Sequence, residues 1–392
     1  MPLVNFPPTL LPPHLIDLRN EVREFLNQEI HNDAFKPTID GWLSGYSPEF
    51  SKKLGHKGWL GMTLPKQVGG QGKSPLERFV VIEELLAAGA PVSAHWVADR
   101  QTAPLLATLG SEAQKNKYLP GVIRGETYFA IGLSEPNAGS DLAALTTKAT
   151  KVDGGWLLNG RKIWSSGAHF CHAMVVLCRT TPLDEKNRHA GMSQLVIDLD
   201  QKGIQIRPIH LISGEHHFNE VSFEDVFVAD DMVVGKIDQG WQQAMGELAY
   251  ERSGPERFLS TLPLFTEMVR LAQQRQNPIV LQAIGKLSAR LLSLHQLSLR
   301  VTGALSRGES ADTEAVLVKD VGTRFEKEIA ETARLIFSAE EFDAEDSDIS
   351  PQLASDYQRF YQKAVLQAPG FTLRGGTNEI LRGIVARGLG LR

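Results

Sequence analysis

The sequence is short of the features that mark secreted, membrane and nucleic-acid-binding proteins. Its 392 residues contain two cysteines, Cys171 and Cys178, which cannot supply a disulfide framework for a chain of this length. No apolar run reaches the roughly 20 residues needed to cross a bilayer, and the Pro-rich start, residues 1–13, does not resemble a signal peptide. Forty-one Lys and Arg against 46 Asp and Glu give a net charge of −5, too weak to attract nucleic acid or an anionic membrane. We therefore expect a cytoplasmic protein with no membrane insertion and no nucleic-acid partner.

What the sequence does contain is an ordinary globular composition, with 42% hydrophobic and 22% charged residues. Apolar residues recur at helical spacing near the start, strand-like runs follow from about Tyr128, and helical patterns return after Gly240. The first helical patterns cover residues 15–26, 76–88 and 102–119; the strand-like runs are 149–152, 156–158, 173–178, 193–197, 205–208 and 219–223; the later helical patterns cover 241–273, 279–305, 313–337 and 357–366, with a last helix from about Thr377.

This order predicts an α+β protein rather than alternating strands and helices. We expect an N-terminal all-α domain over residues 1–126, a middle antiparallel β domain over 127–236 and a C-terminal helical domain over 237–392. The acidic stretch Glu340–Asp348 reads as a solvated loop between two helices.

One cluster has metal-binding atoms without the spacing of a metal site. His169, Cys171 and His172 lie where a strand begins, and Cys178 lies farther along that strand. A zinc site needs four ligands in a recognised spacing. We interpret the cluster as structural and expect no metal.

Three segments offer backbone and hydroxyl donors with little charge. The loop Leu133–Asp141 packs small residues that can approach a polyanion closely, although it is also compatible with an ordinary turn. In Asn159–Gly167 a turn leads to a Trp followed by two Ser, which suits stacking on a flat ring, although a Trp is more often a core residue. In Arg374–Ile380 a Gly-Gly pair precedes a Thr or Asn helix cap. Together they suit a flavin or nucleotide better than a metal.

With these motifs in view, the chain resembles the acyl-CoA dehydrogenase family, flavoproteins that oxidise acyl-CoA thioesters to enoyl-CoA. The resemblance covers nearly the whole chain. The matching segments, in order, are Leu64–Lys66 with Gly69–Gly70, Leu133–Asp141, Lys162–Gly167, Phe223–Val226, Gly240–Trp241, and Gly376–Ile380 before Ala386–Arg387. The resemblance implies an N-terminal helical domain, a middle β-barrel, a C-terminal four-helix bundle and an FAD cofactor. It also implies cofactor-binding roles: Leu133, Ser134, Gly139 and Ser140 line the flavin and CoA phosphates, Trp164, Ser165 and Ser166 flank the isoalloxazine ring, and Thr377, Asn378 and Glu379 complete the FAD site.

The resemblance also identifies a candidate base. Removing the α-proton of a thioester requires a carboxylate and an oxyanion site. Many family members place a Glu directly before the C-terminal Gly-Thr, but here that position is Gly375, whose backbone N–H can still polarise the carbonyl. A second family placement is a Glu before an Arg on a middle helix, which matches Glu251 and Arg252. The alternative is that Glu251 is a solvated helix residue. Glu256–Arg257 repeats the dipeptide on another helical face, and we interpret it as structural.

The implied activity is α,β-desaturation of an acyl-CoA to the trans-2-enoyl-CoA, with electrons passed to an electron-transfer flavoprotein. Two alternatives remain: a non-catalytic partner subunit, and a related flavin oxidase or monooxygenase. Family tetramers share FAD across an interface through a Phe-Gly motif and a Gly-Gly stretch, neither of which is evident here. Residues 270–292 lack the first, and the acidic stretch occupies the place of the second. We therefore expect a homo- or heterotetramer, and hypothesise an α2β2 assembly acting on steroid or other bulky acyl groups.

Overall fold

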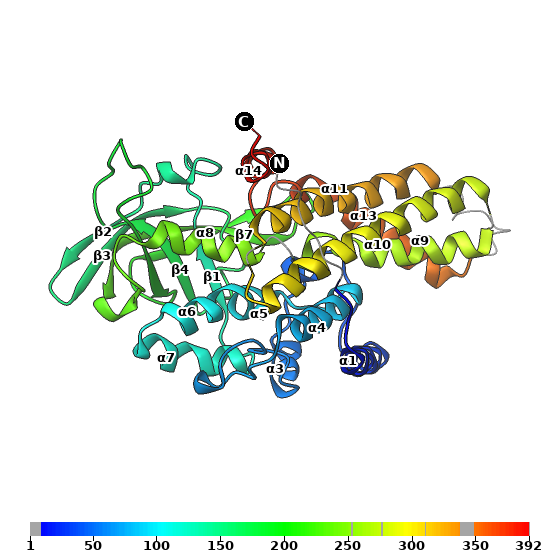
Figure 1. Ribbon diagram of the computed structural model, residues 1–392, viewed down its shortest axis with the longest axis horizontal. Helices are drawn as coiled ribbons and strands as arrows, with labels where there is room; N and C mark the ends of the chain where they lie inside the picture. Colours follow the sequence, from blue (N-terminus) through cyan, green and yellow to red (C-terminus); the bar gives the residue numbers. More distant parts are fainter. Residues whose placement is uncertain (1–8, 252–253, 276, 310, 338–348, 392) are drawn as a thin grey trace. The chain divides into compact units, whose positions relative to one another are not determined.

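A computed structural model describes residues 9–251, 254–275, 277–309, 311–337 and 349–391 (Figure 1). The chain divides into two compact units. The sheet unit consists of residues 45–74 and 92–251, and the helical unit consists of residues 1–44, 75–91 and 252–392. The acidic stretch Glu340–Asp348 lies outside the described residues. The three predicted domain boundaries remain a prediction.

The sheet unit is built on eight strands within the described residues. They are β1 (Phe129–Gly132), β2 (Lys148–Val152), β3 (Gly155–Lys162), β4 (Ala173–Arg179), β5 (Met192–Asp198), β6 (Ile204–His210), β7 (His216–Ala229) and β8 (Val233–Val234). Their order is β6-β7-β3-β2-β4-β5-β8, with β1 paired to β4. Each of the six strand-like runs in the sequence falls within one of these strands.

The sheet differs from the expected antiparallel barrel in two respects. β1 and β2 both pair with β4 in parallel, whereas the other ladders are antiparallel. No ladder among the described strands joins β6 to β8, so the sheet is open. β8 is only two residues long, which is too short to supply a closing edge. The middle β domain is therefore confirmed, but its closure is not.

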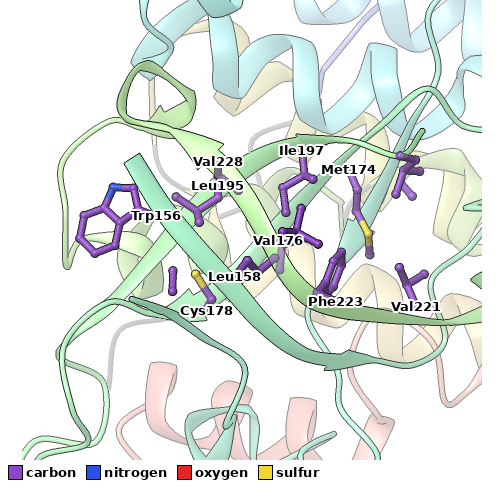
Figure 2. Close-up of a cluster of buried hydrophobic side chains, with 14 of the residues drawn as sticks. Trp156, Leu158, Met174, Val176, Cys178, Leu195, Ile197, Val221, Phe223 and Val228 are labelled. Atoms are coloured by element: carbon purple, nitrogen blue, oxygen red, sulfur yellow. The ribbon is translucent and has the colours of Figure 1, made fainter. Parts of the chain in front are cut away.

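The central strand β4 is buried along its whole length because both of its faces are covered. Figure 2 shows Met174, Val176 and Cys178 on one face, packed in a cluster with side chains of β3, β5 and β7. On the other face, Ala173 and Val175 pack in a cluster that includes helices α6 (Ala103–Leu109) and α7 (Glu112–Ile123). Side chains alternate between the two faces of a strand, so an unbroken apolar run is what a strand covered on both faces requires.

The remaining short elements of the sheet unit surround this core. They are α3 (Pro48–His56), η1 (Lys66–Val68), α5 (Ser93–Val97), η2 (Ala98–Thr102), η3 (Leu142–Ala144), η4 (Asp230–Met232) and α8 (Gly240–Glu251). The predicted helix over 102–119 is interrupted at Gly110, after which Ser111 and Gln114 form a capping box that starts α7.

The helical unit contains the predicted C-terminal bundle. Its elements are α1 (Pro13–His31), α2 (Gly41–Ser44), α4 (Pro75–Ala87), η5 (Pro255–Arg257), α9 (Leu262–Arg275), α10 (Pro278–Ser306), α11 (Asp312–Ile336), α13 (Pro351–Phe371) and α14 (Asn378–Gly388). Helices α9, α10, α11 and α13 pack on one another and run side by side (Figure 1), which confirms the four-helix bundle. Within the described parts of the chain, no helix is both long and apolar enough to cross a membrane.

The sequence pattern over residues 241–273 does not form one helix. Helix α8 ends at Glu251 and α9 begins at Leu262, with the single turn η5 between them. Pro255 lacks an N–H and disfavours helical geometry at the preceding Gly254, so a helix cannot continue through this pair. Glu256 and Arg257 therefore lie on a turn of their own rather than on another face of α8.

Candidate functional site

The loop that follows β1 is held in place by a buried ion pair. Lys162 Nζ lies 2.9 Å from Glu135 Oε1, and the two side chains are 0% and 5% exposed. The same ammonium donates to Leu133 O at 3.0 Å. The N–H groups of Thr146 and Thr147 donate to the Glu135 carboxylate at 2.7 and 2.9 Å. The ion pair therefore ties both ends of the loop to the sheet.

The charge of Glu135 is stabilised in this setting. Burial alone would raise the pKa of Glu135, but the attraction of Lys162 and hydrogen bonds from Thr147, Lys162 and Thr146 outweigh burial and lower the pKa to about 2. Burial lowers the pKa of Lys162, while Glu135 opposes that shift. The folded pKa of Glu135 lies below its ordinary value of 4.5. Its contribution to stability is therefore present above that ordinary value and is lost as the pH falls toward the folded pKa.

Replacing Glu135 with Gln should destabilise the protein by about 3–5 kcal/mol, because it leaves a buried ammonium without its counter-charge. The loop loses its anchor, so the flavin content of the purified protein should also fall. Chemical unfolding and absorbance spectra measure the two effects. Asp230→Asn is the matched control, because the Lys151–Asp230 pair is 52% and 54% exposed and should be worth less than about 1 kcal/mol. Equal losses in the two variants would contradict the anchoring role.

The rim of this loop is open. Leu133 and Ser134 are half-buried, and Gly139 and Ser140 are exposed. Nothing lies within 4 Å of the place where a Cβ atom on Gly139 would sit. Small residues on a rigidly anchored loop let the backbone approach a large polar ligand closely, as the sequence pattern predicts.

The second predicted segment runs along β7. The N–H of Ser165 donates to Asn219 O at 3.0 Å, and the N–H of Asn219 donates back to Ser165 O at 3.2 Å. The Asn219 side chain adds a hydrogen bond from Nδ2 to Ser165 O at 3.0 Å. Ile163 N–H donates to Ser134 O at 2.9 Å. The structure thus brings the first two predicted segments together on one side of the sheet unit.

Trp164 is held in an unusual conformation. Its φ is 61°, in the left-handed region that bulky residues avoid. Its side chain is 53% exposed, and its ring is nearly perpendicular to the Phe218 ring, with the two centroids 5.8 Å apart. Backbone strain of this kind gathers at functional sites. The exposure argues against the alternative that Trp164 is a core residue.

Ser165 carries a hydroxyl that is left unsatisfied. The residue is 0% exposed, and its Oγ has no hydrogen-bond partner among the described groups. A buried hydroxyl without a partner costs free energy, so it marks a place where a ligand can supply the missing bond. Ser166, the next residue, is half-buried.

The third predicted segment lies in the helical unit. Gly375 and Gly376 have φ values of 67° and 89°, which glycine adopts without strain. The buried Lys319 Nζ donates to Gly376 O at 2.7 Å. Thr377 then caps α14, its Oγ1 accepting from the N–H of Ile380 at 3.4 Å. The segment is a tight Gly-Gly turn held by a cation and followed by a capped helix, as expected.

The two residues after the cap differ from each other in their surroundings. Asn378 is 2% exposed and turns into the bundle, where its Oδ1 accepts from Lys319 Nζ at 2.7 Å and its Nδ2 donates to Asp320 O at 3.3 Å. Glu379 is exposed in the first turn of α14, where hydrogen bonds from its own backbone N–H and from Thr377 lower its pKa. A contact of either side chain with FAD remains a prediction, and Glu379 is the more accessible of the two.

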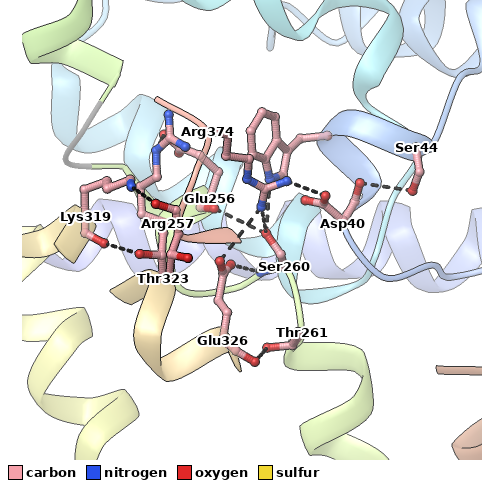
Figure 3. A network of polar contacts seen from close by, with 12 residues as sticks. Asp40, Ser44, Glu256, Arg257, Ser260, Thr261, Lys319, Thr323, Glu326 and Arg374 are labelled. Atoms are coloured by element: carbon pink, nitrogen blue, oxygen red, sulfur yellow. Dashed lines mark hydrogen bonds and ion pairs between the residues drawn. The ribbon is translucent and has the colours of Figure 1, made fainter. Parts of the chain in front are cut away.

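A buried ionic cluster lies next to this segment (Figure 3). Arg374 forms an ion pair and a hydrogen bond with Asp40 and donates to Ser260 Oγ at 3.1 Å. Its guanidinium carbon lies 4.2 Å from the centroid of the Trp42 ring, and Nη2 lies 3.9 Å from Glu326 Oε2. These residues come from distant parts of the sequence, and no motif or spacing in the sequence pointed to Asp40, Trp42 or Glu326.

Glu326 in this cluster should make stability depend on pH. Burial raises the pKa of Glu326 to about 7 from 4.5, although Arg374 opposes the shift. Between these two values the folded protein keeps a proton that the unfolded chain releases, so stability falls as the pH rises through this window. Glu326→Gln removes this term. The unfolding free energy of Glu326→Gln minus that of the wild type should therefore increase by about 3 kcal/mol from pH 4.5 to pH 7.

Urea unfolding of both proteins across this pH range measures the difference. Glu112→Gln is the control, because its side chain is 82% exposed; its stability relative to the wild type should stay constant. A constant difference for Glu326→Gln as well would contradict the raised pKa.

The histidine and cysteine cluster has structural partners. His169 Nδ1 lies 3.1 Å from Asn219 Nδ2, and the N–H of Tyr128 donates to His172 Nδ1 at 3.1 Å. Burial raises the pKa of the Cys171 thiol. Over the described ranges, no group of three or more His, Cys, Asp or Glu is arranged to hold a metal ion.

The predicted base lies at the end of helix α8. Glu251 is the last residue of α8 and belongs to the sheet unit, whereas Gly375 belongs to the helical unit. The side chain of Glu251 and the whole of Arg252 lie outside the described part of the structure. Their catalytic roles therefore remain predictions.

The chain matches family models along nearly its whole length. Residues 13–126 match the acyl-CoA dehydrogenase N-terminal domain, residues 130–226 the middle domain and residues 238–390 the C-terminal domain. The chain belongs to the acyl-CoA dehydrogenase family, whose members are FAD-containing oxidoreductases.

Proteins similar to this chain include two curated relatives and one solved structure. Acyl-CoA dehydrogenase IpdE1 of Mycobacterium tuberculosis is 31% identical over 352 residues, 87% of each chain. Acyl-CoA dehydrogenase FadE29 of the same species is 36% identical over 245 residues, which cover 62% of this chain and 62% of FadE29, less than two thirds of that relative's length. The structure named "Tcur3481-Tcur3483 steroid ACAD" is 31% identical with a TM-score of 0.84, covering 98% of this chain and 99% of that one.

An FAD molecule fits the residues that are present. Trp164 is largely exposed, Ser165 Oγ lacks a hydrogen-bond partner among the described groups, and the rim at Gly139 and Ser140 is open. These are the features that a flat ring with polar edges and a diphosphate require.

Proposed function

We propose that this chain is an FAD-dependent acyl-CoA dehydrogenase that desaturates an acyl-CoA thioester to the trans-2-enoyl-CoA and passes the electrons to an electron-transfer flavoprotein. The observation that carries the proposal is the strained, exposed Trp164 beside the unsatisfied Ser165 hydroxyl. Both lie on the segment that the family resemblance assigns to the flavin ring. When bound, FAD supplies the acceptor for the hydride from the β-carbon.

The chain's own residues hold the reactants and move the α-proton. Trp164 stacks against the ring system and excludes water from one side. The Glu251 carboxylate takes the α-proton, and Arg252 beside it favours the ionised form of that carboxylate before transfer. The N–H of Gly375 donates to the thioester oxygen, on which negative charge develops as the proton leaves.

The proposed substrate is a bulky acyl-CoA, such as the CoA ester of a steroid side chain. The similar solved structure is named a steroid ACAD, which supports this class. A panel of CoA esters, from short straight chains to steroid-like acids, tests it. Turnover of short straight-chain esters in preference to the bulky ones would contradict the proposed substrate class.

The electron acceptor separates the dehydrogenase from a related oxidase or monooxygenase. Under anaerobic conditions a cognate acyl-CoA should bleach the flavin, and ferrocenium should restore its colour without peroxide. Rapid reoxidation by oxygen with formation of peroxide would favour the oxidase alternative.

The proposed assembly is an α2β2 heterotetramer in which a second polypeptide completes the FAD site. The missing Phe-Gly and Gly-Gly motifs support it. Protein expressed alone should then copurify with far less than one FAD per chain, and coexpression with the product of a neighbouring gene should raise this ratio. One FAD per chain in protein expressed alone would contradict the heterotetramer. A full FAD site on the partner, with turnover unaffected by Glu251→Gln, would favour the non-catalytic subunit alternative.

A further inference from the structure

A cation fills the space beside Gly375. A Cβ atom placed on Gly375 would lie 2.9 Å from Nη2, 3.1 Å from Cζ and 3.2 Å from Nη1 of Arg257. The φ of Gly375 is 67°, so a side chain would be strained as well as crowded. The position at which many family members carry their carboxylate thus faces a guanidinium in this chain.

The guanidinium of Arg257 is fixed in place. The residue is 0% exposed, and its guanidinium carbon lies 5.4 Å from the centroid of the Trp42 ring. Helix α11 approaches the backbone of η5 so closely that a Cβ atom on Gly322 would lie 2.4 Å from Arg257 O. Glu256 Oε1 lies 3.9 Å from Arg257 Nε. Since packing holds Arg257 from several sides, its charge acts from one defined position (Figure 3).

A second buried cation holds the other side of the turn. Lys319 is 0% exposed, and its Nζ donates to Gly376 O at 2.7 Å and to Thr372 O at 3.4 Å. The Gly375–Gly376 turn therefore has two buried cations next to it, Arg257 beside Gly375 and Lys319 at the carbonyl of Gly376.

The other acidic groups of this region face other cations. Asp40 and Glu326 both face Arg374. Asp320, one residue from Lys319, pairs with Arg324 and lies 3.5 Å from Arg382. Glu256 is thus the carboxylate that accompanies Arg257 on η5.

We propose that Arg257 is a positioning residue whose fixed charge, beside Gly375, favours the enolate form of the bound thioester. This inference rests on the proposed function. In the step concerned, the α C–H bond breaks, the proton goes to the proposed base Glu251, and the electron pair spreads onto the carbonyl oxygen, to which the N–H of Gly375 is proposed to donate. Fixed charge aimed at a developing oxyanion stabilises it without reorganisation. Here Arg257 provides that charge from its place beside the Cβ position of Gly375.

Ionisation of bound acetoacetyl-CoA on the FAD-loaded protein tests this inference. The probe has an acidic α-proton, and its enolate is followed by ultraviolet absorbance as a function of pH. Arg257→Met should raise the apparent pKa of the bound probe by about 1–2 units, because an opposite charge close by lowers a pKa by that order. Arg257→Lys, which keeps the charge, should restore most of the difference. A purely structural role would affect flavin content and stability without this dependence on charge.

The double variant Glu256→Gln/Arg257→Met removes both members of the buried pair and decides the question if the single variant does not fold. Its probe pKa should still rise, but by less than that of Arg257→Met, because the opposing charge of Glu256 is lost at the same time. An unchanged probe pKa in folded, FAD-loaded variants would overturn the inference and leave the proposed function standing. Failure of the wild-type holoprotein to bind acetoacetyl-CoA would overturn the proposed function and the inference with it.

Discussion

Glu251→Gln should lower kcat on the cognate acyl-CoA by about 10²–10⁴-fold, the usual contribution of a general base. Gln keeps the shape of the side chain but cannot accept the α-proton. FAD should stay bound, because the loop anchored by Glu135 and the Trp164 segment lie elsewhere in the sheet unit. Steady-state kinetics and the flavin absorbance of the purified variant measure both outcomes.

Two further measurements tie this loss of activity to proton removal by Glu251. Exchange of the substrate α-proton with D₂O should be lost together with flavin reduction, since both begin with proton removal. Glu112→Gln, on an exposed side chain at the start of α7, is the control and should keep wild-type kcat. A Glu251→Gln variant that retains more than about a tenth of the activity would exclude Glu251 as the sole base.

Local patterns predicted the elements of the fold well. The unbroken apolar run over residues 173–178 became β4, buried on both faces, and the spacing over 279–305 became α10. The helical spacing of apolar residues predicted continuous helices over 102–119 and 241–273. These helices are interrupted in the structure at Gly110 and at Gly254–Pro255. The closed barrel that the family resemblance implied was also wrong, because no ladder among the described strands joins β6 to β8.

The segments of the candidate site that each occupy one short stretch of sequence could be predicted. The contacts between residues that are far apart in the sequence could not. The loop at 133–141, the Trp-Ser-Ser segment and the Gly-Gly turn each occupy one short stretch and were found from sequence. Arg257 reaches Gly375 only because η5 packs on α11, and Trp42 arrives from the other end of the chain. The only sequence feature that drew attention to Arg257 was the repeated Glu-Arg dipeptide. Because residues 241–273 were predicted to form one helix, this dipeptide was placed on a helix face instead of on the turn η5.

Moving the carboxylate to the more common family position should fail in this chain. In Glu251→Gln/Gly375→Glu, the new Cβ would lie 2.9 Å from Arg257 Nη2 on a backbone with φ of 67°. A carboxylate placed beside a guanidinium has its pKa lowered by about 1–3 units, which weakens it as a base. The double variant should therefore recover less than about a hundredth of wild-type kcat and should unfold at a lower temperature than Glu251→Gln.

Adding Arg257→Met to the double variant tests why a carboxylate at position 375 should fail. Crowding by Arg257 and ion pairing with it would be relieved, whereas a simple misplacement of the carboxylate would not. Met is uncharged and flexible, so it leaves room for the Glu side chain and removes the charge that lowers its pKa. The triple variant should therefore have a higher kcat than the double variant, even though it has lost the charge proposed to favour the enolate. Recovery of more than about a tenth of wild-type activity by the double variant alone would contradict this role of Arg257. It would mean that a base works at position 375 as well as at position 251, despite the guanidinium.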